Sequence, residues 1–422
     1  MKAAPEDFVV EEIVESGAVI RAGMRYGPEA LGMKAHEDGR FCAFVMQKRM
    51  WNTVQALSAL AKRLGRSIRS AGWAGTKDRI SVSTQLCSMF GASPQQVELL
   101  QVKDISINGA WLSDSKVRLG ELRGNRFSVL ARTDDAEAKD CADAICSELN
   151  GVFPNYYGAQ RFGSRGNNVK VGMHIIKGEF EEAAMEFLAG TSGESMREAV
   201  EARQRLERDR DFAAALEYFP SHLKYERLVL RHLARCPTDY ANALRRLPRG
   251  LSLMFVHAVE AYLFNEELTE RVRSGAGAAR GDGDIVCSAD AIGFPEMRTA
   301  NLFNASSPEE GELFVLANVI GYGSKLNDAE ARLLERHQME KEMFRVAHMP
   351  ELGSKGALRP LFAPYVDMRV SIEERGALFS FSLPAGSYAT VLLNEFVEQA
   401  AEQRDGNRSH QGSPHDSNEY IG

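Results

Sequence analysis

The chain has 422 residues and a formal net charge of −7, and hydrophobic residues make up 44% of it. This length favours two or three domains with a substantial buried core, and the composition excludes collagen-like and globally disordered proteins. The acidic balance argues against a general polyanion-binding protein, although it leaves room for a local basic surface.

The sequence favours a protein of the cytoplasm. No apolar stretch approaches the roughly 20 residues that span a bilayer, and the N-terminal MKAAPEDFVV lacks the apolar core of a signal peptide. The six cysteines form no CxxC pair and have no histidine at zinc-ligand spacing. We therefore expect reduced, mostly buried thiols, no metal site and no membrane partner.

The first 150 residues mix predicted strands and helices. Strands are predicted at 7–13, 41–47, 80–90, 102–107 and 126–132, where β-branched and aromatic residues gather. A helix is predicted at 136–150, and another follows the good N-cap residues Asn52 and Thr53. The apolar face of this second helix would carry Val54, Leu57, Leu60, Ala61, Leu64 and Ile68. The mixture favours an α+β fold, with helices packed on a mixed sheet.

Helical periodicity dominates from about 172 to 270. Within it, the charged run REAVEARQRLERDRDF (197–212) is most simply a solvated helix face. Residues 274–284 have the composition of a flexible loop, and 377–399 return to a strand, a glycine turn and a helix. The last residues, 403–422, are polar and predicted to be disordered.

Lys77, Asp78 and Arg79 stand side by side, shortly after Gly72 and Gly75 and before the predicted strand 80–90. A solvated turn and a carboxylate held at the mouth of a site both fit this pattern. The decision depends on what the rest of the chain contains.

Five separated segments of the chain form a set of motifs: KAAPEDFVVEE (2–12), AGWAGTKDRISVSTQ (71–85), RGNRF (123–127), PNYYGAQRFGSRGNN (154–168) and LPAGSYATVLLNEF (383–396). Together they resemble the TruD family of tRNA pseudouridine synthases. A lone KDR is weak, but five motifs in order over nearly the whole chain are specific. The length of the middle region is similar to that of archaeal or eukaryote-like members.

The resemblance implies a pseudouridine-synthase catalytic domain at 1–169 and 370–402, built on a mixed, largely antiparallel sheet. A helix-rich α/β domain specific to the family would be inserted at 170–369. The implied activity is isomerisation of uridine to pseudouridine in tRNA, at position thirteen of the D-arm. This chemistry is redox-neutral and has no group donor, so it implies no cofactor and no small-molecule cosubstrate. The oligomeric state stays open, with a monomer favoured.

The resemblance makes Asp78 the catalytic aspartate and Lys2 the lysine that pairs with it and keeps it ionised. Cleavage of the C1′–N1 bond builds positive charge on the sugar, which a carboxylate beneath it would stabilise. The carboxylate could also add to C1′ or remove a proton from C2′. The sequence does not choose among these routes.

Asn125 and Phe127 match the N-x-F motif of the family. Phe127 would stack on a base flipped out of the RNA stem, or would be a core residue of a strand. Asn125 would orient the base or fix the loop of the site. Lys77 and Arg79 would contact phosphate, or would be ordinary surface ions.

Two further groups are candidates for RNA contact. Gln160 and Arg161 lie beside aromatic residues, which suits RNA binding, although they would also serve to secure a loop. Residues 222–249 are strongly basic, and we predict a phosphate-binding surface there, with a solvated helix face as the alternative. Its candidate residues are Lys224, Arg227, Arg231, Arg245 and Arg246.

Other classes of protein remain as rivals. A catalytically silent tRNA-binding protein on the same scaffold would be free to lose the Lys-Asp-Arg, N-x-F and Gln-Arg sets, which are intact here. An N-glycosidase would need a second carboxylate, and a deaminase would need an H-x-E…C-x-x-C zinc signature. Neither feature is visible in the sequence.

Overall fold

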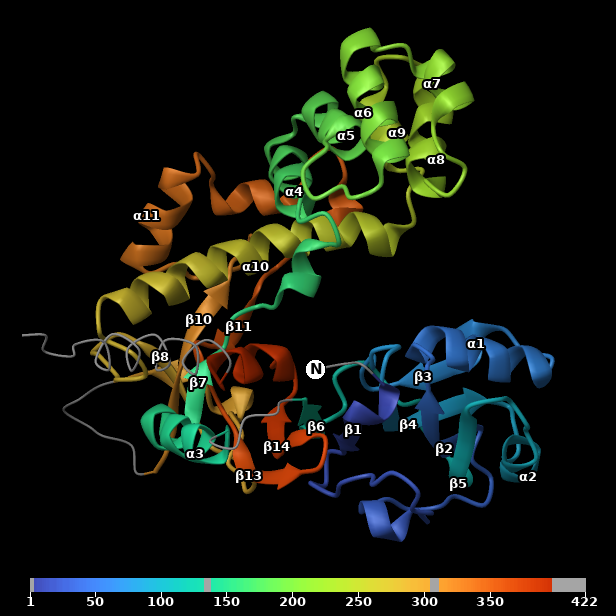
Figure 1. The fold of residues 1–422 in the computed structure, drawn as a ribbon, viewed down its shortest axis with the longest axis vertical. Helices are drawn as coiled ribbons and strands as arrows, with labels where there is room; N and C mark the ends of the chain where they lie inside the picture. Colours follow the sequence, from blue (N-terminus) through green and yellow to red (C-terminus); the bar gives the residue numbers. More distant parts are fainter. Residues whose placement is uncertain (1–3, 133–137, 304–310, 397–422) are drawn as a thin grey trace, which may run out of the picture. The chain divides into compact units, whose positions relative to one another are not determined.

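The computed structural model describes residues 4–132, 138–303 and 311–396 (Figure 1). The chain forms two compact units, each described by itself below. The first comprises Met1–Phe153, Ala289–Pro295 and Ala363–Gly422, and the second comprises Pro154–Ser288 and Glu296–Phe362. The second unit therefore begins at Pro154, before the predicted start of the insertion at 170, and ends at Phe362, before its predicted end at 369. The predicted disordered tail, 403–422, lies outside the described residues.

The described residues of the first unit contain an eight-stranded mixed sheet, in the order β13-β14-β6-β1-β4-β2-β5 with β3 paired to β4. Its strands are β1 Phe8–Ile13, β2 Phe41–Arg49, β3 Ala71–Trp73, β4 Val82–Phe90, β5 Ile105–Ser113, β6 Gly124–Ala131, β13 Val366–Glu373 and β14 Gly376–Pro384. Only β1 and β4 pair in parallel within this part of the chain. The predicted α+β fold with a mixed, largely antiparallel sheet is confirmed.

The helices of the first unit are α1 Thr53–Arg63, α2 Pro94–Glu98 and α3 Ala138–Leu149, and residues 389–396 are also helical. The predicted N-cap is confirmed, because the Asn52 side chain accepts a hydrogen bond from the Gln55 amide. The predicted extent of α1 was wrong. The helix ends at Arg63, before Gly65 takes a φ of +67°. Val54 is 43% exposed, whereas Thr53 is buried.

Two apolar clusters pack on one face of this sheet, and a third, which includes Val45 and Leu86, packs on the other. One cluster joins β1, β6 and β14 to α3 and to the helical residues 389–396, and it includes Phe8, Phe127 and Phe381. A second cluster packs α1 against β2 and β4. Short 3₁₀ helices in this unit lie at Pro5–Asp7, Glu29–Leu31 and Ile68–Ser70.

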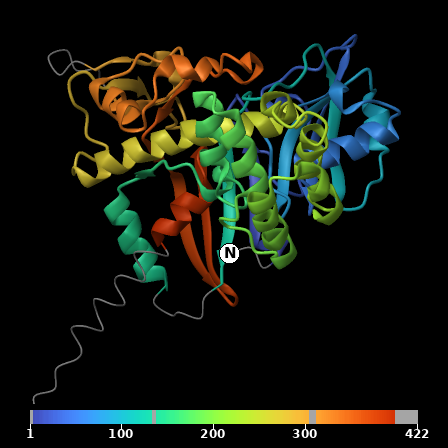
Figure 2. The same ribbon diagram turned by 90° about the horizontal axis from the view of Figure 1, so that it is seen from above.

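The second unit is rich in helices. They are α4 Asn168–Lys177, α5 Phe180–Ala189, α6 Arg197–Asp209, α7 Phe212–Tyr218, α8 Lys224–Leu233, α9 Tyr240–Leu244, α10 Arg249–Arg273 and α11 Asp328–Arg336. Figure 2 shows α10, in yellow, as one continuous helix along this unit. Gly172 lets α4 approach α10 closely, because an added Cβ would lie 2.2 Å from the Phe255 carbonyl oxygen. Short 3₁₀ helices lie at Ala159–Phe162, Met297–Thr299, Lys341–Arg345 and Pro350–Leu352.

An antiparallel sheet in the order β11-β10-β8-β9 packs against the C-terminal half of α10. Its strands are β8 Ile285–Ser288, β9 Asn301–Leu302, β10 Leu313–Val319 and β11 Ala357–Pro360. The remaining strands, β7 Val152–Pro154 and β12 Phe362–Pro364, form a separate pair. Periodicity predicted the helices of this region but did not locate these short strands.

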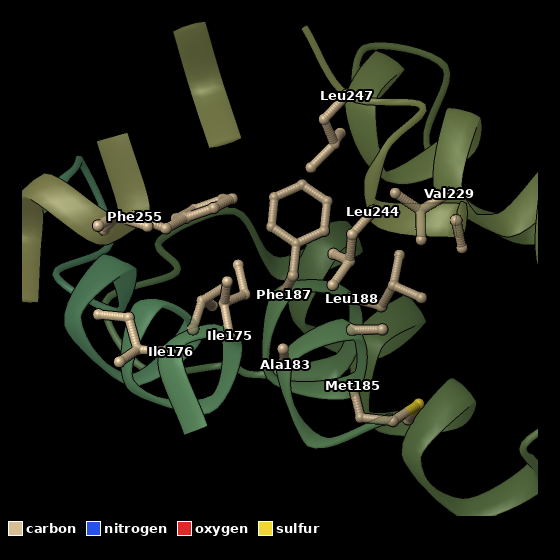
Figure 3. Close-up of a cluster of buried hydrophobic side chains, with 14 of the residues drawn as sticks. Ile175, Ile176, Ala183, Met185, Phe187, Leu188, Val229, Leu244, Leu247 and Phe255 are labelled. Atoms are coloured by element: carbon tan, nitrogen blue, oxygen red, sulfur yellow. The ribbon is translucent and has the colours of Figure 1, made fainter. Parts of the chain in front are cut away.

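The core of the second unit lies where α4, α5, α8 and α10 meet (Figure 3). Ile175, Phe187, Val229 and Phe255 converge there, and the rings of Phe187 and Phe255 meet edge to face at 5.8 Å. Aromatic pairs of this geometry add to the stabilisation from apolar burial.

Most of the charged run 197–212 forms the helix α6, Arg197–Asp209, but this helix is not simply a solvated face. Arg203 is buried and donates hydrogen bonds to the carbonyl oxygens of Phe187 and Leu188, at 3.0 and 2.7 Å. It also pairs with Glu226 at 2.7 Å. A periodic pattern of charge could not reveal that one arginine would be covered by α5 and α8.

No disulfide joins any of the cysteines in the described part of the chain, and Cys42, Cys87 and Cys287 are buried, whereas Cys236 is exposed. Among the described residues, no group of three or more His, Cys, Asp or Glu side chains could hold a metal ion. In the same part of the chain, no helix is both long and apolar enough to cross a bilayer.

Glu267 on α10 gives the second unit a predicted pH dependence. Burial, with the nearby charge of Glu330, raises the pKa of Glu267 to about 8. Because this folded-state pKa lies above the unfolded value, its stability contribution is full below about pH 4.5 and is lost as pH rises through 8. Glu267→Gln should therefore stabilise the protein increasingly between about pH 5 and 8, by up to about 1.4 kcal/mol per pH unit. Denaturant unfolding at several pH values measures this.

The control for this prediction is Glu335→Gln, which removes an exposed carboxylate of α11 in the same unit. Its stability difference from the parent should not grow with pH. Equal pH dependence of the parent and Glu267→Gln would contradict the prediction.

Candidate active site

Residues 74–81 form the loop between β3 and β4, and we call this segment the KDR loop. β4 lies in the middle of the first sheet, between β1 and β2. Asp78 and Arg79 are exposed on the loop, whereas Lys77 is buried. Because one of these three adjacent charges is buried, the loop is more than a solvated turn.

A buried ion pair attaches the KDR loop to β1. Lys77 Nζ lies 2.6 Å from Glu12 Oε2, and both side chains are almost fully buried. The other oxygen of Glu12 accepts the Leu86 amide of β4 at 2.9 Å. The surface-ion alternative for Lys77 is wrong, because the side chain is buried against Glu12, whereas its contact with phosphate stays a prediction. The Lys77 ammonium points into the protein because it pairs there with the Glu12 carboxylate.

A second set of bonds runs through Thr53, the first residue of α1. The Thr53 hydroxyl accepts the Lys77 amide at 2.9 Å and donates to Gln85 Oε1 at 2.8 Å. Gln85 in turn donates to the carbonyl oxygen of Gly75 at 3.1 Å. All of these groups are shielded from water except at Gly75, so α1, β4 and the loop are joined by a largely buried polar network.

The main chain of Asp78 is fixed from the buried side. Its carbonyl oxygen accepts Lys48 Nζ and the Ser81 hydroxyl, both at 2.9 Å. These bonds leave the residue itself exposed. This aspartate is held through its backbone on a loop that is anchored to β1, β2, β4 and α1. The arrangement suits a carboxylate that must meet a substrate in one geometry.

Asn125 and Phe127 lie two residues apart on β6, so they share one face of the sheet. Asn125 is opposite Glu12 on β1, which places it on the same face as the Glu12–Lys77 pair. The Asn125 Oδ1 atom is buried, and no donor among the described residues reaches it. A buried acceptor without a donor is costly, so this oxygen is a candidate for substrate contact.

Phe127 is only 7% exposed and belongs to the core of the first unit. Its ring stacks on Phe381 with 5.5 Å between centroids, and Phe8 meets it edge on at 6.1 Å. Phe127 therefore lies where the alternative prediction, a core residue of a strand, would place it. Stacking on a base would need the ring to be uncovered first.

Lys2, Gln160 and Arg161 are the remaining predicted site residues. Lys2 is outside the described residues, so its pairing with Asp78 stays a prediction. Gln160 and Arg161 belong to the 3₁₀ helix Ala159–Phe162 of the second unit. The Arg161 guanidinium lies 5.2 Å from the centre of the Tyr157 ring, a cation–π distance.

Arg161 also acts on titratable groups of α10. Burial lowers the pKa of His257, and the charge of Arg161 lowers it further. Burial raises the pKa of Glu260 to about 7, against the opposing effects of Ser354 and Arg161. The Gln-Arg motif therefore borders a buried, titratable part of the second unit.

The basic residues of 222–249 divide into two groups. Arg227 donates to the carbonyl oxygens of Leu216 and Phe219 and caps α7, and Arg245 pairs with Glu351 at 2.8 Å. Arg246 is exposed and donates to His232 Nδ1 at 3.3 Å. Lys224 and Arg231 are exposed on one side of α8, and no ion pair among the described residues includes them.

Four residues of this site escaped the sequence analysis: Glu12, Lys48, Thr53 and Gln85. Glu12 and Gln85 lie inside the quoted motifs, but a polar residue in a strand usually indicates an exposed position. The signal was available in the run Ser83-Thr84-Gln85, where polar residues fall on both faces of β4. All three are fully buried.

Comparison with known proteins gives consistent results. A sequence model of the family described as "tRNA pseudouridine synthase D (TruD)" matches residues 1–396. The chain is 32% identical over 420 residues to "Probable tRNA pseudouridine synthase D" of Methanosarcina acetivorans, covering 93% of this chain and 91% of the relative. It is 35% identical over 364 residues to the protein of the same description from Methanopyrus kandleri, covering 85% and 86%.

A solved structure is also similar. It is described as the crystal structure of the putative tRNA pseudouridine synthase D from Methanosarcina mazei. The TM-score is 0.73 at 29% identity, and the match covers 94% of this chain and 93% of that one. The similarity therefore extends over both units of the chain.

Proposed function

Because this chain belongs to the tRNA pseudouridine synthase D (TruD) family, we propose that it isomerises uridine in tRNA with Asp78 as the catalytic group. Family membership makes the protein a tRNA pseudouridine synthase, an isomerase. The observation that supports Asp78 most strongly is the KDR loop. Its buried side is anchored to β1, β2, β4 and α1, while Asp78 itself is exposed.

The reaction breaks the C1′–N1 bond of uridine and forms a C1′–C5 bond after the uracil has turned. C5 loses a proton and N1 gains one, so that substrate and product are isomers. In the proposed mechanism the Asp78 carboxylate stabilises the positive charge that develops at C1′, adds to that atom, or takes a proton from C2′. Each of these routes needs an ionised carboxylate at one fixed place.

Recognition of the base is assigned to Asn125. The N3–H group of uracil is a donor, and the buried Asn125 Oδ1 is an acceptor that no described residue satisfies. Lys2 would keep Asp78 ionised, and the exposed Arg79 would meet phosphate. Lys77 is assigned to positioning, because its ammonium is buried against Glu12.

The finer target is uridine 13 of the D-arm, as the family resemblance implies. A base in a stem must leave the helix before a carboxylate can reach its sugar. The first unit would perform this chemistry, and the second would hold the tRNA through Gln160, Arg161 and exposed cations of α8. Because the proposed substrate is tRNA, we also propose that the protein acts in the cytoplasm.

The direct test is incubation of the protein with unmodified tRNA transcripts, followed by chemical mapping of pseudouridine. We expect a single modified position, at uridine 13, and none in a transcript with cytidine there. Modification at another uridine would contradict the target but not the activity. Tight tRNA binding without any product would favour the silent tRNA-binding protein.

The exposed cations of α8 make a separate prediction. Lys224, Arg231 and the exposed Arg235 follow one side of α8 and its C-terminal end, and we call them the α8 basic stripe. Replacing all three by glutamine should raise the Kd for tRNA and flatten its salt dependence. The slope of log Kd against log salt should fall by about 2–3, because about 0.7–0.9 of a counterion is released per phosphate contact. Filter binding over a salt series measures it.

The matched control is Arg245→Gln, in which the lost guanidinium was already paired with Glu351 and the His348 carbonyl oxygen. We expect little change in its salt slope. If the stripe variant keeps the parental slope, or if Arg245→Gln lowers the slope as much per charge, the basic stripe is not an RNA surface.

A further inference from the structure

Lys48, near the end of β2, is a buried cation of the first unit. Its ammonium donates to the carbonyl oxygen of Trp51 at 2.6 Å and to that of Asp78 at 2.9 Å. No ion pair among the described residues includes it. The two acceptors are therefore main-chain dipoles, one on the turn after β2 and one at the proposed catalytic residue.

A lysine in this position is expensive to keep charged. Burial and the neighbouring charge of Lys77 together lower the pKa of Lys48 to about 8, against the opposing effects of Asp78 and Cys87. Methionine would fill the same space without the cost of desolvation. The two hydrogen bonds of the ammonium, to the carbonyl oxygens of Trp51 and Asp78, explain why a lysine is present here.

The turn that Lys48 bonds is itself joined to the KDR loop. Met50 adopts a φ of +58°, which is strained for a residue with a side chain, and its amide donates to the Ser81 carbonyl oxygen at 3.4 Å. Three residues after Met50, the Thr53 hydroxyl accepts a hydrogen bond from the Lys77 amide. The turn and the loop thus meet at Ser81 and Lys77, and Lys48 bridges them in between at Asp78.

We propose that Lys48 is a positioning residue, which sets the place of the Asp78 carboxylate by tying the Asp78 carbonyl to the turn after β2. This inference rests on the proposed role of Asp78. In this proposal, Lys48 does not contact any atom that reacts. Moving the loop main chain would displace the carboxylate, and a displacement of about 1 Å can cost a factor of about a hundred in rate.

The test uses the full-length protein with an unmodified tRNA transcript in single-turnover reactions. Lys48→Met removes the charge and both hydrogen bonds but keeps an unbranched side chain. We expect the rate constant at saturating tRNA to fall about 10- to 100-fold, with the reaction amplitude kept and the Kd for tRNA within about threefold.

Arg203→Met is the matched control, because Arg203 is also a buried cation that bonds main-chain carbonyl oxygens, but in the second unit. Its loss should lower stability and thus the amplitude, while the folded fraction keeps the parental rate constant. If Lys48→Met also loses only amplitude, or keeps the parental rate constant, the positioning role is overturned.

A second measurement decides the matter if Lys48→Met does not fold. The parental rate constant should fall as pH rises through about 8, where Lys48 loses its proton. The other titratable groups whose charges act on Lys48 are Lys77, Asp78 and Cys87. Lys48→Arg stays charged and should lack this alkaline limb. An identical limb in both proteins overturns the inference. Appreciable turnover by Asp78→Asn would instead contradict the proposed catalytic aspartate on which it rests.

Discussion

Asp78→Asn should abolish pseudouridine formation, with a loss of at least about 10²–10⁴-fold in the single-turnover rate constant. The amide is nearly isosteric with the carboxylate, but it carries no charge and neither adds to C1′ nor accepts a proton. Binding of tRNA should stay within about threefold of the parent, because the carboxylate acts mainly in the transition state.

The structure separates this loss from a loss of folding. Lys48 and Ser81 bond the main-chain carbonyl of Asp78, and these bonds survive the substitution. The midpoint of thermal unfolding should therefore stay close to that of the parent. Asp114→Asn, at an exposed carboxylate of the same unit, should keep full activity.

Asp78→Glu tests position rather than charge. The longer side chain keeps the carboxylate but moves it by one methylene group, and we expect a loss of about a hundredfold or more. Appreciable turnover by Asp78→Asn would mean that another group performs the chemistry. Parental turnover by Asp78→Glu would mean that the anchoring of the loop is not needed for precise placement.

The sequence could predict the outline of the fold and the identity of the loop. Alternating apolar residues located β1, β2, β4 and β6 within a few residues, and Asn52 began α1 as predicted. These elements are recognisable because local side-chain periodicity decides them. The extent of α1 was set by the conformation of Gly65, which periodicity does not report.

The polar network under the KDR loop could not be predicted in the same way. Glu12, Thr53 and the pair Lys77 and Gln85 come from three segments that are separated in sequence, and each residue alone is typical of an exposed position. They are buried because each satisfies another, which is a property of the folded arrangement. The pattern of charges likewise did not predict that Arg203 and Arg227 bond main-chain carbonyl oxygens, because those contacts also arise only in the folded arrangement.

Breaking the Glu12–Lys77 pair should have the largest effect on stability. Glu12→Gln leaves the Lys77 ammonium buried without its counterion, and removing one partner of a buried pair typically costs about 3–5 kcal/mol. For a protein of this size we expect the midpoint of thermal unfolding to fall by about 10 °C. Activity of the folded fraction should fall as well, because the pair holds the residue next to Asp78.

The double variant Glu12→Gln/Lys77→Met provides the sharper measurement. It removes both charges, so no uncompensated ion stays buried, and the protein should be more stable than either single variant. Glu98→Gln is the control, because its pair with Arg25 is exposed and worth less than about 1 kcal/mol. If the double variant loses the sum of the two single losses, the ion pair is not the unit that anchors the loop. If instead its stability recovers but its rate constant does not, then the pair is kept for the placement of Asp78 rather than for stability. We expect this second result, because a buried ion pair contributes little net stability compared with apolar residues of similar volume.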